Sequence, residues 1–549
     1  MADITIYKAK NIITMNPRQP TASHVAVRDG MILGAGDLQD LAGWGAHVVD
    51  DRFADKVLMP GMIEGHSHAM EGSVWQDTYV GYYDRRGPDG RVHPALRSID
   101  DVVARLAEVD AAMDDPDAPI MAWGFDPIYF EGRRMVAADL DRVSTTRPVL
   151  ITHASFHIIN TNSVVLNRAN ITGNTNVMGI MKGDDGEPTG ELQGMPARYL
   201  VFGAIGRDHF AEMTKQESLW RFAQSAQLAG VTTATDLSNE LPEHAVANLK
   251  AVTERADYPL RIVPAFAGTA CPADEGAAKV KGLIGQSNEK LRFGLVKLVA
   301  DGSIQGFTAR LKDPGYYNGH ENGLWYIDPD EIPRIIATYR AAGLQVHIHT
   351  NGDQATEVVL DAIEQALQQT PNADARFTLQ HCQMAHEAHY RRMARLGVCV
   401  NLFANHLFYW GDQHVAQTMG PERAARMNAT GMAKRHGVPT AIHSDAPITP
   451  LAPLFTAWCA VNRRTMSGQV LGAAERLSVE DAVFAVTLGA AYTLKLDGEL
   501  GSIETGKRAD FAVLEDDPLT VGGDGLKDIA VWGTVVSGTV FPCADIGKT

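Results

Sequence analysis

The sequence predicts an α/β protein built on a TIM-like (β/α)8 barrel, with a small composite β-sandwich domain made from both termini and a large insertion after the first barrel strand. Three observations indicate this fold class. Helix-like and strand-like segments alternate through the middle of the chain, and both ends are rich in short β-prone segments. At 549 residues the chain is also longer than one compact domain usually is.

Both ends of the chain carry strand patterns. Near the N-terminus, residues 25–33 contain two apolar runs around an Asp-Gly turn, which is typical of a hairpin. Near the C-terminus, residues 509–514 and 529–536 show a similar pattern of apolar runs and turns. We therefore expect residues 1–58 and 492–549 to form one composite β-sandwich.

The segment 59–491 is predicted to form the barrel. Apolar strands such as 344–349 and 438–443 follow helical segments, and polar residues stand at the ends of these strands. Repeated units of this kind indicate a parallel sheet whose strands all end at the same edge. The stretch from about 71 to 193 lacks the alternation and is predicted to be the insertion.

Metal-binding side chains occur at the ends of several predicted strands. His66 and His68 are two residues apart, so on a strand both imidazoles face the same way. Imidazole nitrogens and carboxylate oxygens are common ligands of Zn2+ and related divalent ions. The sequence therefore predicts one metal centre with six candidate ligands: His66, His68, Lys297, His349, His381 and Asp445.

Lys297 ends an apolar strand and is unusual among these candidates. A protonated amine cannot bind a metal, but burial and nearby positive charge can make a lysine neutral. The neutral amine can then add carbon dioxide and form a carbamate whose two oxygens bridge two metal ions. A salt bridge between Lys297 and Asp301 is the structural alternative.

Two histidines leave their roles open, because each lies two residues before a candidate ligand on the same strand face. His347 competes with His349, which is favoured because it lies nearer the carboxyl end of its strand. His443 precedes Asp445 and either contacts the substrate or packs in the core. Asp445 could hold the attacking water and pass its proton to the leaving nitrogen.

Further side chains are candidates for contact with a substrate. His157 lies in the predicted insertion and could hydrogen-bond a developing oxyanion, with a structural role as the alternative. Aromatic residues follow two barrel strands and could either wall an apolar substrate or pack in the core. The predicted catalytic residues are Asp445 and His157. The predicted substrate contacts are Trp75, His347, Phe408, Trp410 and His443.

The composition excludes several classes of partner. A formal net charge of −17 argues against binding to nucleic acid or to an anionic membrane surface. No apolar run reaches the roughly 20 residues that span a bilayer, and the N-terminus lacks the pattern of a signal peptide. The 5 cysteines are scattered, without a CxxC pair, which favours a reducing compartment. We expect a cytoplasmic homodimer that acts on a small molecule.

Taken in order, the motifs resemble those of the amidohydrolase superfamily. Within it they look like the amidohydrolase-3 (YtcJ-like) branch of metal-dependent hydrolases, and they are similar to N-substituted formamide deformylases. The resemblance covers nearly the whole chain. It rests on Gly65-His66-Ser67-His68, the Lys-x-x-x-Asp-Gly-Ser segment at Lys297, the His-x-x-Gly-Asp segment at His349 and the tail 501–510.

The resemblance implies a TIM-like barrel and one or two divalent metal ions, with zinc as the expected metal. It matches His66, His68, His349 and His381 to histidine ligands, Lys297 to a lysine that is often N6-carboxylated, Asp445 to a ligand and general acid/base, and His157 to a histidine that faces the site. His443 departs from the branch, in which glycine is more frequent before Ser-Asp. This departure concerns the local substrate geometry rather than the metal chemistry.

The residues and the resemblance together predict an amidohydrolase that cleaves the carbon–nitrogen bond of a small, N-substituted or aromatic amide. A deaminase of an aminated heterocycle that uses a single metal is one alternative. Lys297 argues against it, since a mononuclear deaminase needs no carbamate bridge. Hydrolysis of cyclic amides or esters, and a catalytically silent barrel that serves as a binding protein, are further alternatives.

Overall fold

The computed structural model describes residues 4–130 and 133–546 of the chain. These residues form two compact units: Ala69–Phe222 is one, and the residues before and after that segment are the other. Among the described residues, no helix combines the length and the apolar character needed to cross a lipid bilayer.

Eight parallel strands form the barrel of the first unit, in the order β20-β19-β18-β17-β16-β15-β14-β5. A bridge between Ser67 and Ala446, with a 2.9 Å hydrogen bond from His68 N to Ala446 O, joins the segments that follow the two edge strands and closes the sheet. The strands are β5 (Met62–Glu64), β14 (Val231–Asn239), β15 (Arg261–Ala267), β16 (Leu295–Val299), β17 (Gln345–Thr350), β18 (Thr378–His381), β19 (Cys399–Leu402) and β20 (Thr440–Ile442). The predicted (β/α)8 barrel is confirmed.

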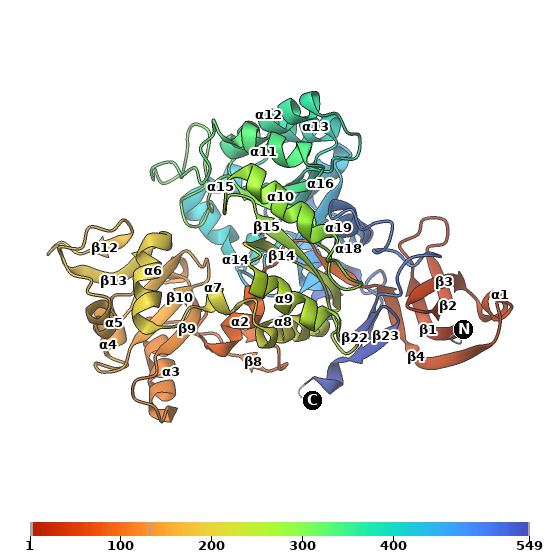
Figure 1. Cartoon of the computed structure of the whole chain (residues 1–549), viewed down its shortest axis with the longest axis horizontal. Helices are drawn as coiled ribbons and strands as arrows, with labels where there is room; N and C mark the ends of the chain where they lie inside the picture. Colours follow the sequence, from red (N-terminus) through yellow and green to blue (C-terminus); the bar gives the residue numbers. More distant parts are fainter. Residues whose placement is uncertain (1–3, 131–132, 547–549) are drawn as a thin grey trace. The chain divides into compact units, whose positions relative to one another are not determined.

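Helices connect these strands and cover the barrel, as α9 and α10 do beside β14 and β15 (Figure 1). They are α8 (Gln216–Leu228), α9 (Glu243–Thr253), α10 (Ala273–Ile284), α11 (Ile332–Ala341), α12 (Asp353–Gln369), α13 (Glu387–Leu396), α14 (Asn405–Gln413), α15 (Gly420–Ala424), α16 (Thr430–Arg435), α17 (Pro453–Asn462), α18 (Val479–Ala485) and α19 (Leu488–Thr493). In α12 the buried residues Val359, Ile363 and Ala366 recur at spacings of three and four, which places them on the face toward the core.

Helix α19 closes the amino-terminal end of the barrel. Gln345, the first residue of β17, donates a 2.8 Å hydrogen bond from Nε2 to the carbonyl oxygen of Thr493. Ala490 and Ala491 belong to one buried apolar cluster with the strand residues Ile63 and Leu295. The opposite end of the barrel, where the strands have their carboxyl ends, is where enzymes of this fold carry their active sites.

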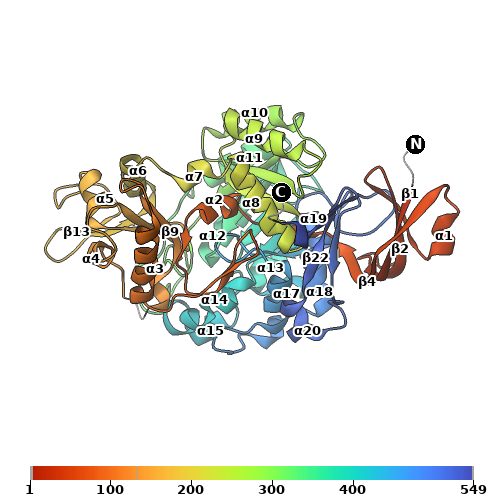
Figure 2. The same cartoon turned by 90° about the horizontal axis from the view of Figure 1, so that it is seen from below.

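The two termini together build one seven-stranded sheet, ordered β23-β22-β21-β4-β1-β2-β3. The long strand β4 pairs with β1 in parallel and with β21 in antiparallel orientation, so the red N-terminal and blue C-terminal strands meet there (Figures 1 and 2). The elements are β1 (Ile4–Ile13), β2 (Thr21–Arg28), β3 (Met31–Gly36), α1 (Leu38–Ala42), β4 (His47–Pro60), β21 (Phe511–Leu514), α20 (Gly522–Gly525), β22 (Val531–Val536) and β23 (Thr539–Pro542). The β domain made from both termini is confirmed.

The inserted unit follows β5 and has a six-stranded sheet, ordered β12-β13-β11-β10-β9-β6, and a separate pair β7-β8. Its elements are α2 (Met70–Ser73), β6 (Thr78–Tyr79), β7 (Arg85–Arg86), β8 (Val92–His93), α3 (Ile99–Ala112), β9 (Ile120–Phe125), α4 (Ala137–Asp141), β10 (Val149–His153), β11 (Ile158–Thr161), α5 (Ser163–Arg168), β12 (Ile180–Lys182), β13 (Pro188–Gln193), α6 (Gly194–Ile205) and α7 (His209–Glu212). Helix α3 begins with a capping box between Ser98 and Asp101, which satisfies backbone N–H groups that the first turn leaves without partners.

Candidate metal centre

The predicted ligands come from five barrel strands or from the residues that follow them. His66 and His68 follow β5, and Asp445 follows β20. Lys297 lies on β16, His349 on β17 and His381 at the end of β18. His381 and Asp445 have φ angles of 68° and 56°, in the left-handed region that non-glycine residues seldom adopt and that is common at functional sites.

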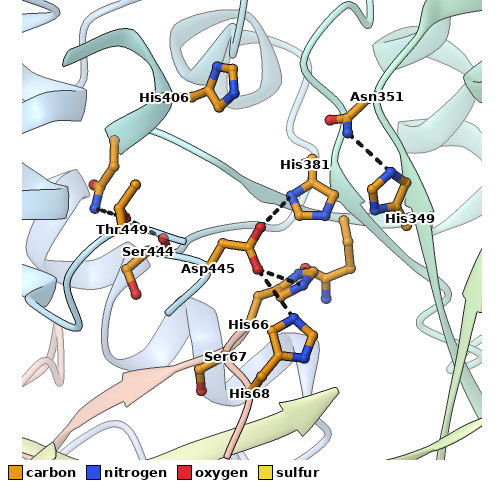
Figure 3. Close-up of polar contacts among 12 residues, drawn as sticks. His66, Ser67, His68, His349, Asn351, His381, His406, Ser444, Asp445 and Thr449 are labelled. Atoms are coloured by element: carbon orange, nitrogen blue, oxygen red, sulfur yellow. Dashed lines mark hydrogen bonds and ion pairs between the residues drawn. The ribbon is translucent and has the colours of Figure 1, made fainter. Parts of the chain in front are cut away.

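Asp445 lies at the centre of three of the predicted histidines (Figure 3). Its Oδ1 is 3.3 Å from His66 Nε2 and 3.4 Å from His68 Nε2. Its Oδ2 is 4.0 Å from His381 Nδ1. Burial raises the pKa of Asp445, but His68, His443 and Lys297 together outweigh burial and hold the pKa below its ordinary value, so the carboxylate is ionised.

His443 belongs to the same cluster of rings. One ligand nitrogen each of His66, His381 and His443 can lie within 4.8 Å of the others. The His443 ring stacks on that of His66 with centroids 4.6 Å apart and on Phe403 at 4.9 Å. Burial lowers the pKa of His443 to about 3 and that of His66 well below its ordinary value, so both imidazoles are neutral and able to act as ligands.

Lys297 lies inside the barrel with 3% of its surface exposed. Within the described part of the chain its Nζ has no hydrogen-bond partner, and burial lowers its pKa to about 7 although Asp445 acts in the opposite direction. Asp301, the alternative partner, instead accepts backbone N–H groups from Asn351 at 2.9 Å and Gly352 at 2.8 Å. A salt bridge between Lys297 and Asp301 is therefore not formed.

His349 lies beside this cluster rather than in it. Its ring centroid is 4.5 Å from that of His381, but its Nε2 is 3.1 Å from both Asn351 Nδ2 and Gly302 O (Figure 3). The structure therefore brings His66, His68, His381 and Asp445 together most closely, with His349 one ring further along the strand ends.

His347 lies deeper in the barrel and is fully buried. Its Nδ1 is 2.8 Å from Gln380 Nε2, and its Nε2 is 3.0 Å from the carbonyl oxygen of Thr493. Both ring nitrogens thus have protein partners, and neither is left to contact a substrate.

The other predicted contacts divide between the two units. His157 and Trp75 belong to the inserted unit, where His157 is exposed and Trp75 donates from Nε1 to Glu71 Oε1 at 2.9 Å. Phe408 and Trp410 lie on α14. Trp410 is buried beside His406, with ring centroids 4.6 Å apart, and Phe408 is half-buried against other aromatic rings. The substrate roles of all four residues stay predictions.

Two buried polar residues next to the cluster were missed in the sequence. Glu64 accepts hydrogen bonds from Ser444 Oγ at 2.7 Å and from His66 N at 3.3 Å, and burial raises its pKa to about 8. Gln380 lies with its Oε1 2.8 Å from His66 Nδ1. Glu64 lies two residues before His66 and Gln380 lies directly before His381, so adjacency to a ligand was the available signal.

The donor atoms fit a tetrahedral divalent cation. Two ligands about 2.0–2.1 Å from a zinc ion at the tetrahedral angle lie roughly 3.3 Å apart, close to the separations of Asp445 Oδ1 from the nitrogens of His66 and His68. In the described residues, Lys297 Nζ, His381 Nδ1 and both ring nitrogens of His443 are buried without hydrogen-bond partners. Buried polar atoms usually have partners, so this group has the free bonding capacity that ligands of a divalent cation need.

Comparison with known proteins identifies the family. The family model described as "Amidohydrolase family" matches residues 54–542. Putative amidohydrolase YtcJ of Bacillus subtilis (strain 168) is 28% identical over 549 residues, covering 96% of this chain and 97% of that protein. N-substituted formamide deformylase of Arthrobacter pascens is 25% identical over 556 residues, covering 98% of both. The chain belongs to the amidohydrolase family.

Solved structures agree in fold. An uncharacterized metal-dependent hydrolase from Pyrococcus horikoshii OT3 superimposes with a TM-score of 0.73 at 21% sequence identity, covering 95% of this chain and 99% of that one. Family membership supports a hydrolase and confirms the resemblance inferred from the motifs of the chain.

Proposed function

We propose that this member of the amidohydrolase family uses a zinc-type metal centre and Asp445 to cleave the carbon–nitrogen bond of a small N-substituted amide. The observation that carries the proposal is the position of Asp445. One of its oxygens faces two histidine nitrogens at 3.3 and 3.4 Å, and the other lies toward His381. A carboxylate placed in this way can hold a cation and exchange a proton with a reacting group beside it.

The metal would be held by His66, His68, His381 and Asp445, with His349 and Lys297 as the further ligands that the family motif implies. A divalent ion bound there supplies Lewis-acid polarisation of a carbonyl and lowers the pKa of water toward about 7. Lys297 would contribute as a carbamate: its neutral amine attacks carbon dioxide, a carbon–nitrogen bond forms, and one proton leaves to solvent. Its lowered pKa, about 7, supports this role because the reaction needs the neutral amine.

Asp445 would move the proton. As an ionised carboxylate it accepts a proton from the attacking water, and it then donates that proton to the nitrogen that leaves as the amine. Asp445 therefore ends the cycle ionised, as it began. The role of His157 toward a developing oxyanion stays a prediction from the sequence.

The substrate class follows from the relatives. The deformylase of Arthrobacter pascens is named for its action on N-substituted formamides, and it matches this chain over nearly its whole length. Aromatic side chains on α14, including the half-buried Phe408, suit an apolar N-substituent. We therefore propose an N-formyl or short N-acyl amide with an apolar or aromatic amine portion.

Metal analysis of the purified protein combined with a substrate panel tests the proposal. The panel contains N-substituted formamides, short N-acyl amines, cyclic amides, esters and aminated heterocycles. We expect one or two zinc ions per chain and release of an amine from the first two classes. Release of ammonia from an aminated heterocycle would show that the protein is a deaminase and not an amide hydrolase. Protein that binds no divalent ion would overturn the metal centre.

A further inference from the structure

A line of hydrogen-bonded groups crosses the barrel interior from Thr493 to His66. The carbonyl oxygen of Thr493 lies 3.0 Å from His347 Nε2, and His347 Nδ1 lies 2.8 Å from Gln380 Nε2. The other end of the Gln380 amide, Oε1, lies 2.8 Å from His66 Nδ1. The line therefore runs from the helix that closes one end of the barrel to the cluster around Asp445.

The starting point of the line can only accept hydrogen bonds. Thr493 is the last residue of α19, so its carbonyl has no partner within the helix. It is approached by three side-chain donors, at 3.0 Å by His347 Nε2, at 2.8 Å by Gln345 Nε2 and at 3.3 Å by Thr378 Oγ1. A carbonyl oxygen has no hydrogen to give, and so the hydrogen between Thr493 and His347 must be on His347 Nε2.

Each later hydrogen position follows from the first. A neutral imidazole carries one N–H, so His347 Nδ1 is an acceptor and must face the NH2 end of Gln380. The oxygen end of Gln380 then faces His66, and His66 Nδ1 must be the donor. The remaining nitrogen of His66, Nε2, is left with a lone pair that points to Asp445 Oδ1 at 3.3 Å. Two atoms with lone pairs facing each other are stabilised by a cation between them.

Burial makes this order of donors and acceptors strict. His347, Gln380 and Thr493 are each 0% exposed, and His66 is 2% exposed. Water therefore cannot replace a hydrogen-bond partner that is lost inside the barrel. If the Gln380 amide turned over, its NH2 group would face the Nδ1–H of His66, and two donors would oppose each other.

We propose that His347 and Gln380 are positioning residues that transmit the acceptor character of the Thr493 carbonyl to His66, so that His66 presents Nε2 to the metal. This inference rests on the proposed metal centre and adds to it two residues that do not touch the metal. Gln380 fixes the His66 tautomer, and His347 fixes which end of the Gln380 amide faces His66. Hydrogen-bond partners behind a ligand commonly have a large share in metal affinity.

The test measures zinc affinity by competition with a chromophoric chelator in the full-length protein. Gln380→Met keeps the side-chain length and removes both hydrogen bonds, and we expect it to weaken zinc binding about 10- to 100-fold. Gln380→Glu keeps an acceptor for His66 and is expected to bind zinc at least as tightly as the wild type. His347→Phe lets the Gln380 amide turn over and is expected to weaken binding in the same direction as Gln380→Met.

Asn401→Leu is the matched control. Asn401 pairs with Gln380 in the strand register, is fully buried, and has neither end of its amide hydrogen-bonded within the described residues. Removing this interior amide should leave zinc affinity unchanged. If Asn401→Leu weakens zinc binding as much as Gln380→Met does, the effect is one of general packing. The proposed positioning role of His347 and Gln380 is then overturned.

A spectroscopic measurement reports on the tautomer directly. In the cobalt(II)-loaded wild type, the Nδ1–H of His66 should give a paramagnetically shifted proton resonance that exchanges slowly with solvent. It should move or broaden in Gln380→Met and persist in Asn401→Leu. An unchanged His66 resonance and an unchanged zinc affinity in Gln380→Met would overturn the positioning role of His347 and Gln380 and leave the proposed metal centre intact.

Two further outcomes are decisive. If Gln380→Met does not fold, the zinc affinities of Gln380→Glu and His347→Phe are compared instead. Equal affinities overturn the positioning role, and tighter binding by Gln380→Glu supports it. Wild-type protein that binds neither zinc nor cobalt overturns the metal centre itself, and with it the positioning role of His347 and Gln380.

Discussion

Two regions of this protein place histidines and a carboxylate within metal-binding distance of one another, and they differ in whether these atoms already have partners. At the barrel mouth, His66, His68 and Asp445 form such a group, and on the outer helices Glu357, His386 and His389 form another. The first group lies among buried nitrogens without hydrogen-bond partners in the described chain, whereas the second is supplied with counter-charges.

The partners of Glu357 account for its whole carboxylate. Its Oε2 is 2.8 Å from Lys312 Nζ and 2.9 Å from His389 Nε2, and its Oε1 is 3.1 Å from Arg392 Nη1. His389 Nδ1 accepts the backbone N–H of His386 at 3.3 Å. A cation would have to displace two basic side chains here. Closeness of donor atoms is thus a weak sign of a metal site, and unmet bonding capacity is a stronger one.

The largest expected effect is at Asp445. Asp445→Asn removes the proton acceptor and keeps an oxygen that can bind the metal, so turnover of the best amide in the panel should fall about 10²- to 10⁴-fold. Bound metal, measured by elemental analysis, should stay near the wild-type level. Wild-type turnover by this variant would exclude Asp445 as the acid/base.

Single histidine changes in the two regions should separate them in metal affinity. His68→Ala removes a ligand at the barrel mouth and should weaken zinc binding by more than about 100-fold. His389→Ala removes the corresponding side chain from the helix cluster and should leave the zinc content unchanged. A loss of one zinc ion per chain in His389→Ala would mean that the basic side chains do not exclude a metal.

Lys297 should make the metal-free protein more stable as the pH rises from 7 to 10. Its folded-state pKa, about 7, lies below that of a lysine in the unfolded chain, so between pH 7 and 10 the unfolded chain binds more protons. The free energy of unfolding should therefore rise with pH over this range. Lys297→Met should remove this dependence and stabilise the metal-free protein at pH 6 by about 2 kcal/mol or more. Urea unfolding at several pH values measures both, and a flat wild-type profile would contradict the prediction.

Glu357 should give a smaller effect at acid pH. Lys312 holds the pKa of Glu357 at about 2, so its contribution is present above the pKa of an unfolded glutamate and is lost as pH falls toward 2. The group is partly exposed, which limits the contribution to less than about 1 kcal/mol. Unfolding of Glu357→Gln between pH 5 and pH 2 should show a correspondingly shallower loss of stability. If the free energy of unfolding falls equally steeply with pH in wild type and variant, the ion pairs of Glu357 contribute nothing to stability.

Strand periodicity predicted much of the fold but could not assign roles within one strand. His347 and His349 share a strand face, as their spacing implies, and the structure separates them by depth. The His347 ring, deeper in the barrel, bonds to Gln380 and Thr493, whereas the His349 ring lies beside His381. Depth depends on the register with neighbouring strands, and register is not present in local spacing.

The sequence by itself determined the alternation of strands and helices, the (β/α)8 class with a β domain from both termini, the family, and the order of the metal-binding residue types. Only the tertiary structure decided which polar atoms lack partners and which pairs of residues far apart in the chain are bonded. Gln380 meets His66 across 314 positions of sequence, and Thr493 meets His347 across 146. Spacing along a chain sets the direction in which a side chain points, but its partner is set by how the barrel closes.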